Sequence, residues 1–344
     1  MRKTVLALLL TALLLTGCGQ NHIKTESVRE DALDIVVTVF PAYDFARAVG
    51  GELANVTLLL LPGAESHSYE PTPADILAVQ NCDLFLYLGG ESDAWVETIL
   101  SAIDLQGSTM RMIDCVKLLE EAHVEGMQME PGHDHDHDEQ DCDDESHAQE
   151  EVFEDAEHDH GVHGLGVVTG LDEHVWTSPK NAAEITRHVG ERLAELDGTH
   201  AETYLQNAEN YAAEIDELHR AFLNFFDGVQ SKTIIFGDRF PLLYFAEEYD
   251  LDYYAAFPGC GTQTEPSAAT IAFLTDKVRA ENISHVMYIE FSNHLVADSI
   301  AEACGKETAL FHTCHNVARS EIEAGETYVS LMTRNLETLK TCMR

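Results

Sequence analysis

The 344-residue chain is long enough for two lobes with separate cores, and its composition of 45% hydrophobic and 24% charged residues is that of a globular protein. Its formal net charge of −41 at pH 7 would be repelled by nucleic acids and by anionic membrane surfaces, so neither is expected as a partner. Cations, in contrast, would accumulate around such a chain.

The N-terminus predicts a lipoprotein signal peptide at residues 1–17. Arg2 and Lys3 precede an apolar core that is too short to span a bilayer as a mature helix. The tetrapeptide Leu-Thr-Gly-Cys that ends at Cys18 then matches a bacterial lipobox, although an ordinary signal peptide with a chance cysteine is the alternative. We therefore expect lipidation of Cys18, a polar tether at residues 18–33, and export to the outer face of the bacterial cytoplasmic membrane.

Strands and helices alternate in the first half of the mature chain. Short β-branched and apolar runs predict strands at residues 34–40, 55–61, 83–88 and 110–113. Helical patterns lie between or after them, at residues 42–49, 72–80 and 95–103. This alternation indicates βαβ units with a parallel sheet.

Two helical segments then lead to a second α/β lobe. Ser178 and Pro179 begin the first helix, and the second, at about residues 199–226, would be about 40 Å long at 1.5 Å per residue. The predicted architecture is α/β: two βαβ lobes with parallel sheets, joined by one long linking helix, with a metal site between the lobes. The expected divisions are an N-terminal lobe, linking helices and a C-terminal lobe, at residues 34–178, 179–229 and 230–344.

A stretch rich in histidine and acidic residues interrupts the first lobe at residues 132–163. It has too little apolar surface to offset its ordering entropy, which predicts a disordered, solvated loop. Its imidazoles, carboxylates and single thiol are ligands for divalent cations, although a plain acidic linker is the alternative. The accessory metal ligands expected here are His133, His135, His137, His147, His158, His160 and His163.

Two further histidines lie where open α/β sheets bind ligands, beyond strand ends and next to helix starts. His67 follows the strand at residues 55–61 and precedes a proline-stiffened helix start, although a surface-loop histidine is the alternative. His174 comes just before the helix that Ser178 begins. Either Glu70 or Asp172 could accept a hydrogen bond that orients one of these imidazoles.

The motifs around these histidines resemble those of the metal-binding lipoproteins of bacterial zinc and manganese ABC importers, the cluster A-I solute-binding proteins. They are H-x-Y-E-P-T-P from His67, D-E-H-V-W-x-S-P around His174, and Y-x-x-L-M-x-x-N-L-x-x-L at residues 328–339. A His-rich acidic loop before the second motif is typical of the zinc-type members. The resemblance covers essentially all of the mature chain and implies that His67 and His174 are metal ligands.

The resemblance implies two more ligands, and this sequence departs from the pattern at one of them. The family's third ligand, His or Glu, lies five residues before a Tyr-Phe-Ala helix start, where this chain has Arg239, which cannot bind a cation. We expect the neighbouring Asp238 to substitute, unless it pairs with Arg239 or caps the next helix. The fourth position, an Asp in the family, is best matched by His312, with His315 as second choice. Cys260 and Cys314 are further possible soft ligands.

Two or three imidazoles with one carboxylate suit tetrahedral Zn²⁺, whereas Mn²⁺ would want more oxygen ligands. The expected function is an extracytoplasmic, monomeric, high-affinity zinc-binding protein that delivers the ion to an ABC permease. A separate ATPase would power that permease, because the sequence contains no P-loop. A manganese receptor and a surface metal-buffering or adhesin-type lipoprotein are the alternatives. We expect no enzyme, since a zinc hydrolase needs a general base and the chain has no HExxH motif.

Overall fold

The computed structural model describes residues 23–24, 31–64, 69–127, 170–259 and 265–343. The predicted signal peptide with Cys18, the His- and acid-rich segment at residues 132–163, His67 and Cys260 therefore lie outside the described residues. Within the described ranges, no helix combines the length and the apolar character needed to cross a membrane.

The first lobe is built on a five-stranded sheet in the order β1-β3-β2-β4-β5. β2, β3, β4 and β5 are parallel, and the two-residue β1 pairs antiparallel with β3. The strands are β1 (Ile23–Lys24), β2 (Leu33–Val37), β3 (Ala54–Leu58), β4 (Leu84–Tyr87) and β5 (Ser108–Arg111). The helices of this lobe are α2 (Phe40–Gly50), α3 (Pro73–Asn81) and α4 (Ala94–Ala102).

The second lobe has a four-stranded, all-parallel sheet in the order β7-β6-β8-β9. Its strands are β6 (Thr233–Phe240), β7 (Asp252–Pro258), β8 (His285–Tyr288) and β9 (Glu307–Leu310). Its helices are α7 (Leu243–Tyr249), α8 (Ala268–Ala280), α9 (Leu295–Cys304), α10 (Arg319–Glu323) and α11 (Tyr328–Cys342). The predicted α/β class with parallel sheets is confirmed in both lobes.

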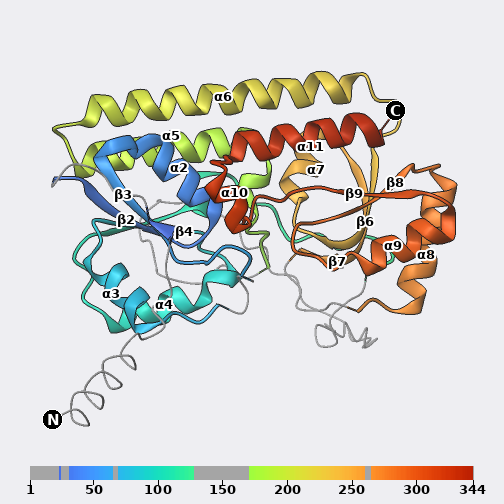
Figure 1. Cartoon of the computed structure of the whole chain (residues 1–344), viewed down its shortest axis with the longest axis horizontal. Coiled ribbons are helices and arrows are strands. Elements are labelled where there is room, and N and C mark those ends of the chain that lie inside the picture. The colour runs from blue at the N-terminus through green and yellow to red at the C-terminus, as the bar shows by residue number, and fades with distance from the viewer. Residues whose placement is uncertain (1–22, 25–30, 65–68, 128–169, 260–264, 344) are drawn as a thin grey trace, which may run out of the picture.

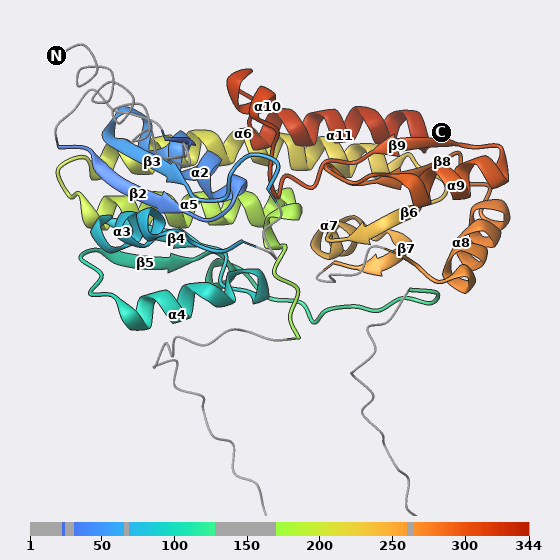
Figure 2. The same cartoon turned by 60° about the horizontal axis from the view of Figure 1, so that its bottom comes forward.

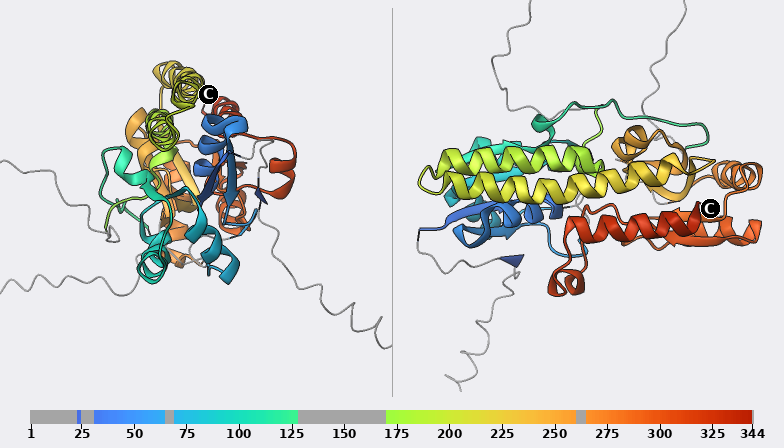
Figure 3. Two further views of the ribbon diagram at one scale, coloured as in Figure 1. Left: turned by 90° about the vertical axis from the view of Figure 1, so that its left-hand side faces the viewer. Right: turned by 90° about the horizontal axis from the view of Figure 1, so that it is seen from above.

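Two helices join the lobes, α5 (Pro179–Leu196) and α6 (Ala201–Asp227). α5 begins where Pro179 follows Ser178, whose side chain accepts a hydrogen bond from the backbone N–H of Asn181. α6 lies along both lobes, with α5 on one side of it and α11 on the other (Figures 1 and 3). Tyr204, Ile215 and Phe222 on α6 are buried, so this helix is part of the core of both lobes.

One cluster of buried apolar side chains continues from the first lobe into the second. At the junction, Phe45 of α2 contacts Tyr328 of α11, with ring centroids 5.4 Å apart in an edge-on arrangement. Within the second lobe, Phe311, after β9, contacts Phe245 of α7 edge-on at 5.2 Å. The lobes therefore share packed aromatic side chains, which resist large relative displacements.

The chain also crosses between the lobes before residue 128. The segment 116–127 leaves the first lobe and runs to the second (Figure 2). There, Gly126 packs so closely on Phe273 that a β-carbon at this glycine would lie 2.1 Å from the ring. The described chain resumes at Gly170, whose carbonyl accepts a hydrogen bond from the N–H of Glu121 at 3.1 Å. On one side of residues 128–169 the chain thus packs on α8, and on the other side it pairs with the crossing segment.

Candidate metal centre

A cavity of about 240 Å³ lies between the lobes, at the carboxyl ends of strands from both sheets. The polar side chains that line it come from His174 of the first lobe and from Arg239, Glu290, Thr313, His315 and Asn316 of the second. The Asn316 amide also donates hydrogen bonds to the carbonyls of Leu61 and Ala64, at 2.9 and 2.8 Å. Ala64 lines the cavity too, three residues before His67, which lies outside the described residues.

His174 is fixed by its own loop, just before α5. Its side chain is 1% exposed, and its backbone N–H donates to Asp172 Oδ1 at 2.8 Å. The ring atom Nδ1 lies 3.2 Å from the same carboxylate oxygen. A carboxylate only accepts hydrogen bonds, so this contact assigns the ring proton to Nδ1 and directs Nε2 away from Asp172. An imidazole oriented in this way is suited to bind zinc through Nε2.

His315 faces His174 from the second lobe. The centroids of the two imidazole rings are 5.8 Å apart, and their planes are inclined by 74°. Trp176 lies against both rings, at 5.5 Å from His174 and 5.2 Å from His315. The indole Nε1 of Trp176 donates to the carbonyl of Thr313 at 2.9 Å, which ties the first lobe to the turn that carries His315.

His312, the expected fourth ligand, does not line the cavity that holds His174. Its Nδ1 accepts a hydrogen bond from the N–H of Cys314 at 3.0 Å, and its Nε2 lies 3.6 Å from Glu321 Oε2. Asn335 of α11 holds its backbone with two hydrogen bonds, at 2.8 and 2.7 Å. The structure therefore brings the second choice, His315, next to His174, and it places His312 in a separate cavity beside α11.

Two carboxylates lie close to the His312 ring, with Glu290 Oε1 at 3.8 Å from Nδ1 and Glu321 Oε2 at 3.6 Å from Nε2. Burial alone would lower the pKa of His312, but the carboxylates of Glu290 and Glu321 outweigh burial and raise the pKa. In return, the interaction with His312 lowers the pKa of Glu321 to about 2. These contacts give His312 a structural role in joining the turn to α10.

Asp238, the expected third ligand, lies in an adjacent cavity of about 250 Å³. Its Oδ1 accepts the backbone N–H of Arg239 at 2.8 Å, and its Oδ2 accepts that of Ile289 at 3.4 Å. β6 extends to Phe240, so Asp238 belongs to a strand. The carboxylate that shares the cavity with His174 and His315 is Glu290.

The remaining residues proposed from the sequence also differ in whether they contact the site. Asp172 contacts His174, whereas Glu70 is exposed and does not line the cavity. Cys314 is buried next to the turn, and burial raises the pKa of its thiol well above the usual value, which disfavours the thiolate that binds metals. Within the described ranges, no three His, Cys, Asp or Glu residues are grouped closely enough to hold a metal ion. Completion of a site around His174 and His315 therefore requires a further ligand.

Glu173, which precedes His174 in the chain, forms a buried acidic pair with Asp93. Glu173 is 2% exposed, and its Oε2 accepts the N–H of Ser92 at 3.0 Å. Asp93 is 5% exposed and accepts hydrogen bonds from Thr38 and from the backbone of Leu88 and Gly89. Burial, and after it the nearby charge of Glu173, raises the pKa of Asp93 to about 7.

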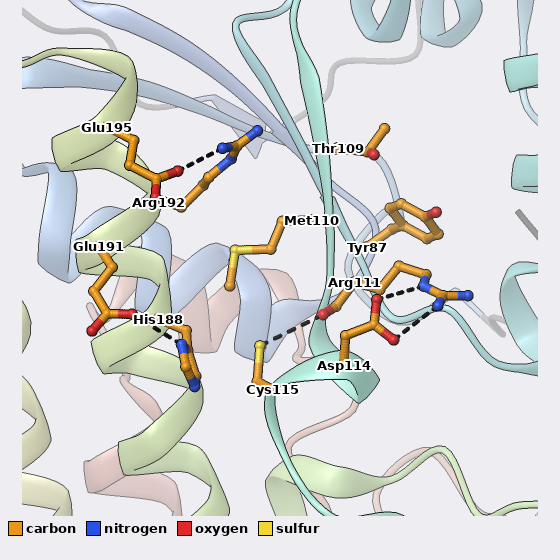
Figure 4. Close-up of a pocket in the computed structure, with 10 residues that line it drawn as sticks. All are labelled: Tyr87, Thr109, Met110, Arg111, Asp114, Cys115, His188, Glu191, Arg192 and Glu195. Carbon is orange, nitrogen blue, oxygen red and sulfur yellow. Dashed lines mark hydrogen bonds and ion pairs between the residues drawn. The ribbon is translucent and has the colours of Figure 1, made fainter. Parts of the chain in front are cut away.

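A larger cavity, of about 510 Å³, lies between β5 and α5 (Figure 4). Its charged side chains are engaged in local pairs: Arg111 with Asp114 at 2.8 Å, Arg192 with Glu195 at 2.7 Å, and His188 with Glu191 at 3.1 Å. These side chains come from α5 and from the end of β5 and the residues after it. Neither His174 nor His315 lines this cavity. The inter-lobe cavity is therefore the better metal site, although it is the smaller one.

Sequence reasoning missed Glu290, Thr313 and Trp176. Glu290 follows the end of β8 by two residues, which is a position where α/β sheets often carry ligand-binding groups. That signal was available in the sequence. Nothing in the sequence, however, links Thr313 to Glu290 or to Trp176, because these contacts join distant parts of the chain.

Comparisons with known proteins agree with this architecture. The family model described as zinc-uptake complex component A, periplasmic, matches residues 35–342. The zinc-binding lipoprotein AdcA of Streptococcus pneumoniae R6 is 27% identical over 331 residues, which cover 96% of this chain and 59% of the relative. The high-affinity zinc uptake system protein ZnuA of Bacillus subtilis is 27% identical over 337 residues, which cover 95% and 93%.

The chain thus spans about three-fifths of the length of the AdcA relatives that it matches. Among solved structures, the Zn(II)-bound ZnuA-like domain of Streptococcus pneumoniae AdcA superposes with a TM-score of 0.68 at 25% identity. That superposition covers 91% of this chain and 99% of the domain.

Proposed function

This chain belongs to the zinc-uptake complex component A family, and on that basis we propose that it is an extracytoplasmic zinc receptor. It binds Zn²⁺ between its lobes and delivers the ion to an ABC permease that a separate ATPase drives. The protein acts as a monomeric binding protein and not as an enzyme. The observation that carries the proposal is the facing pair of imidazoles in the inter-lobe cavity, the buried His174 and the half-buried His315.

The proposed ligand set differs from the one expected from sequence. His174 and His315 supply two imidazoles, and His67, three residues after Ala64 in the sequence, supplies the third. His315 replaces His312, whose ring nitrogens contact Cys314 and Glu321. Asp238 is left out of the set, because both of its carboxylate oxygens accept backbone N–H groups in the adjacent cavity.

Zinc is favoured over manganese by the chemistry of these donors. Imidazole nitrogen suits Zn²⁺, which takes four ligands, whereas Mn²⁺ prefers sites richer in oxygen. The Nδ1 contact between His174 and Asp172 is the kind of outer hydrogen bond that accompanies zinc-bound histidine. The names of the relatives, which are zinc-binding and zinc-uptake proteins, support the same choice.

The segments outside the described residues have proposed roles as well. Lipidation of Cys18 anchors the protein to the outer face of the cytoplasmic membrane. The histidines of residues 132–163 collect zinc weakly and raise its concentration near the cavity. Before residues 128–169 the chain packs on the second lobe through Gly126, and after them Gly170 pairs with Glu121.

Calorimetry tests the proposal on protein that starts at Gly19, with and without residues 132–163. We expect one tight zinc site that survives the deletion, binds Mn²⁺ more weakly, and is lost in His174→Ala. His188→Ala is the matched control, since this imidazole lies in the cavity between β5 and α5. If tight binding disappears with residues 132–163, the protein is a surface metal buffer and the receptor proposal fails.

A further inference from the structure

The carboxylate of Glu290 accepts hydrogen bonds from the turn that runs from His312 to His315. The backbone N–H of Thr313 donates to Glu290 Oε2 at 2.7 Å, and the Thr313 hydroxyl donates to Glu290 Oε1 at 2.5 Å. The oxygen of the same hydroxyl accepts a hydrogen bond from the backbone N–H of His315 at 3.2 Å. A continuous path of hydrogen bonds therefore runs from Glu290 through Thr313 to His315.

The hydrogen bonds between Glu290 and Thr313 are expected to be strong. The Glu290 side chain is 8% exposed, and hydrogen bonds to a carboxylate that is shielded from water are stronger than those between neutral groups. The turn also needs such support, because Cys314 has a φ of +62°, a left-handed conformation that is unfavourable for a residue with a β-carbon. Without an outside contact, the turn would relax, and the direction of the next residue, His315, would change.

A second contact reaches the same threonine from the first lobe. The Thr313 carbonyl accepts the indole N–H of Trp176 at 2.9 Å, and the indole ring lies against both His174 and His315. Thr313 is thus held by Glu290 from the second sheet and by Trp176 from the first lobe. Both contacts act on a residue within the turn, two positions before His315.

We propose that Glu290 is a positioning residue for metal binding, which acts through Thr313 to hold the His315 imidazole toward His174. This inference rests on the proposed zinc site. Glu290 lines the metal cavity, but each of its carboxylate oxygens already accepts a hydrogen bond from Thr313. Its contribution to zinc affinity is therefore the orientation of His315.

Substitutions on the path test the inference through zinc affinity and through a spectroscopic signature. Glu290→Gln keeps the shape of the side chain but loses one of the two acceptor oxygens, and Thr313→Val removes the hydroxyl link. Thr313→Ser restores the hydroxyl and is the rescue variant. Glu321→Gln is the matched control, because this glutamate pairs with His312 on the side away from the cavity.

Zinc affinity is measured by competition with a chromophoric chelator, and Co²⁺ absorption bands report the coordination geometry. We expect Glu290→Gln and Thr313→Val to raise the zinc dissociation constant by roughly 10- to 100-fold and to weaken the tetrahedral Co²⁺ bands. Thr313→Ser and Glu321→Gln should keep the parental affinity and spectrum. Circular dichroism of the metal-free variants checks that each is folded. If Glu290→Gln is not folded, the comparison of Thr313→Val with Thr313→Ser provides the test.

Two results overturn the inference: parental affinity and spectrum in both Glu290→Gln and Thr313→Val, or equal losses in Thr313→Ser and Thr313→Val. His315→Ala separates this inference from the proposed function. If His315→Ala keeps tight zinc binding, the proposed ligand set itself is wrong. If His315→Ala loses zinc while Glu290→Gln and Thr313→Val do not, only the positioning role is wrong.

Discussion

The imidazole ring of His174 meets that of His315 edge-on across the two lobes, with the ring centroids 5.8 Å apart. One ring is oriented by Asp172 in its own loop, and the backbone of the other is held through Thr313. Trp176 fills the space beside both rings. The facing imidazoles are therefore placed by contacts on each side of the cleft.

The two histidines after β9 should behave in opposite ways when they are removed. His315→Ala should weaken zinc binding by more than the roughly 10- to 100-fold typical of outer contacts, because it deletes a ligand. His312→Ala should keep the affinity but lower the free energy of unfolding by about 1–3 kcal/mol, since it leaves the Cys314 N–H and the Glu321 carboxylate without their partner. Chelator competition and urea unfolding of the metal-free protein measure the two effects. The reverse pattern would return His312 to the ligand set.

Zinc affinity should depend steeply on pH below about pH 6. Zinc binds neutral imidazole, so protons compete with the metal once the histidines begin to protonate. With His174 and His315 both bound, the affinity should fall by roughly tenfold per pH unit for each imidazole that titrates. Competition titrations between pH 8 and pH 5 measure this slope. An affinity that stays flat to pH 5 would contradict a site built on imidazoles.

Asp93 should make the folded protein less stable as the pH rises. Its pKa is raised to about 7 by burial and by Glu173, whereas the unfolded chain has an ordinary aspartate pKa of about 3.9. The folded state therefore holds the proton more tightly, and the stability that this group contributes is fully present below about pH 4 and lost as the pH rises through about 7.

Asp93→Asn removes that titration and should raise the free energy of unfolding at pH 8 by ~2 kcal/mol relative to the parent protein. The gain should shrink toward pH 5, where the parent is already mostly protonated. Urea unfolding at both pH values measures it, with the exposed Asp104→Asn as control. A gain that grows as the pH falls would rule out a raised pKa at this site.

Gly90 should tolerate no side chain, because it packs directly on Glu173 next to His174. A β-carbon at Gly90 would lie 2.0 Å from Glu173 Oε2 and 2.4 Å from the Glu173 β-carbon. Gly90→Ala should cost about 1–3 kcal/mol of stability and should also weaken zinc binding, since Glu173 must move. Gly198→Ala is the control, because nothing lies within 4 Å of its added β-carbon. Equal effects of the two substitutions would contradict this packing argument.

Local patterns in the sequence were sufficient to predict the fold. Runs such as the one that forms β4 are buried on both faces, as parallel strands are, and the cap formed by Ser178 and Pro179 begins α5 as expected. His174 was predictable for the same reason, since its position depends on its neighbours in the chain. The register shift through which β6 continues to Phe240 is a feature that local patterns do not predict.

The choice between His312 and His315 could not be made from local sequence. Both follow β9 within a few residues, and the side chain that reaches the cavity is decided by the left-handed conformation of Cys314. That conformation depends on hydrogen bonds that Glu290 and Asn335 accept from the backbone of Thr313 and His312, 23 residues away in the chain. Such long-range contacts leave no periodic signal in the sequence.

The most direct test of the account is an anomalous difference map of the zinc-loaded protein, recorded above and below the zinc absorption edge. The account predicts one strong peak in the inter-lobe cavity, with imidazole nitrogens of both His174 and His315 at about 2.0–2.1 Å. A peak beside His312 and Glu321, or the absence of any peak between the lobes, would contradict it.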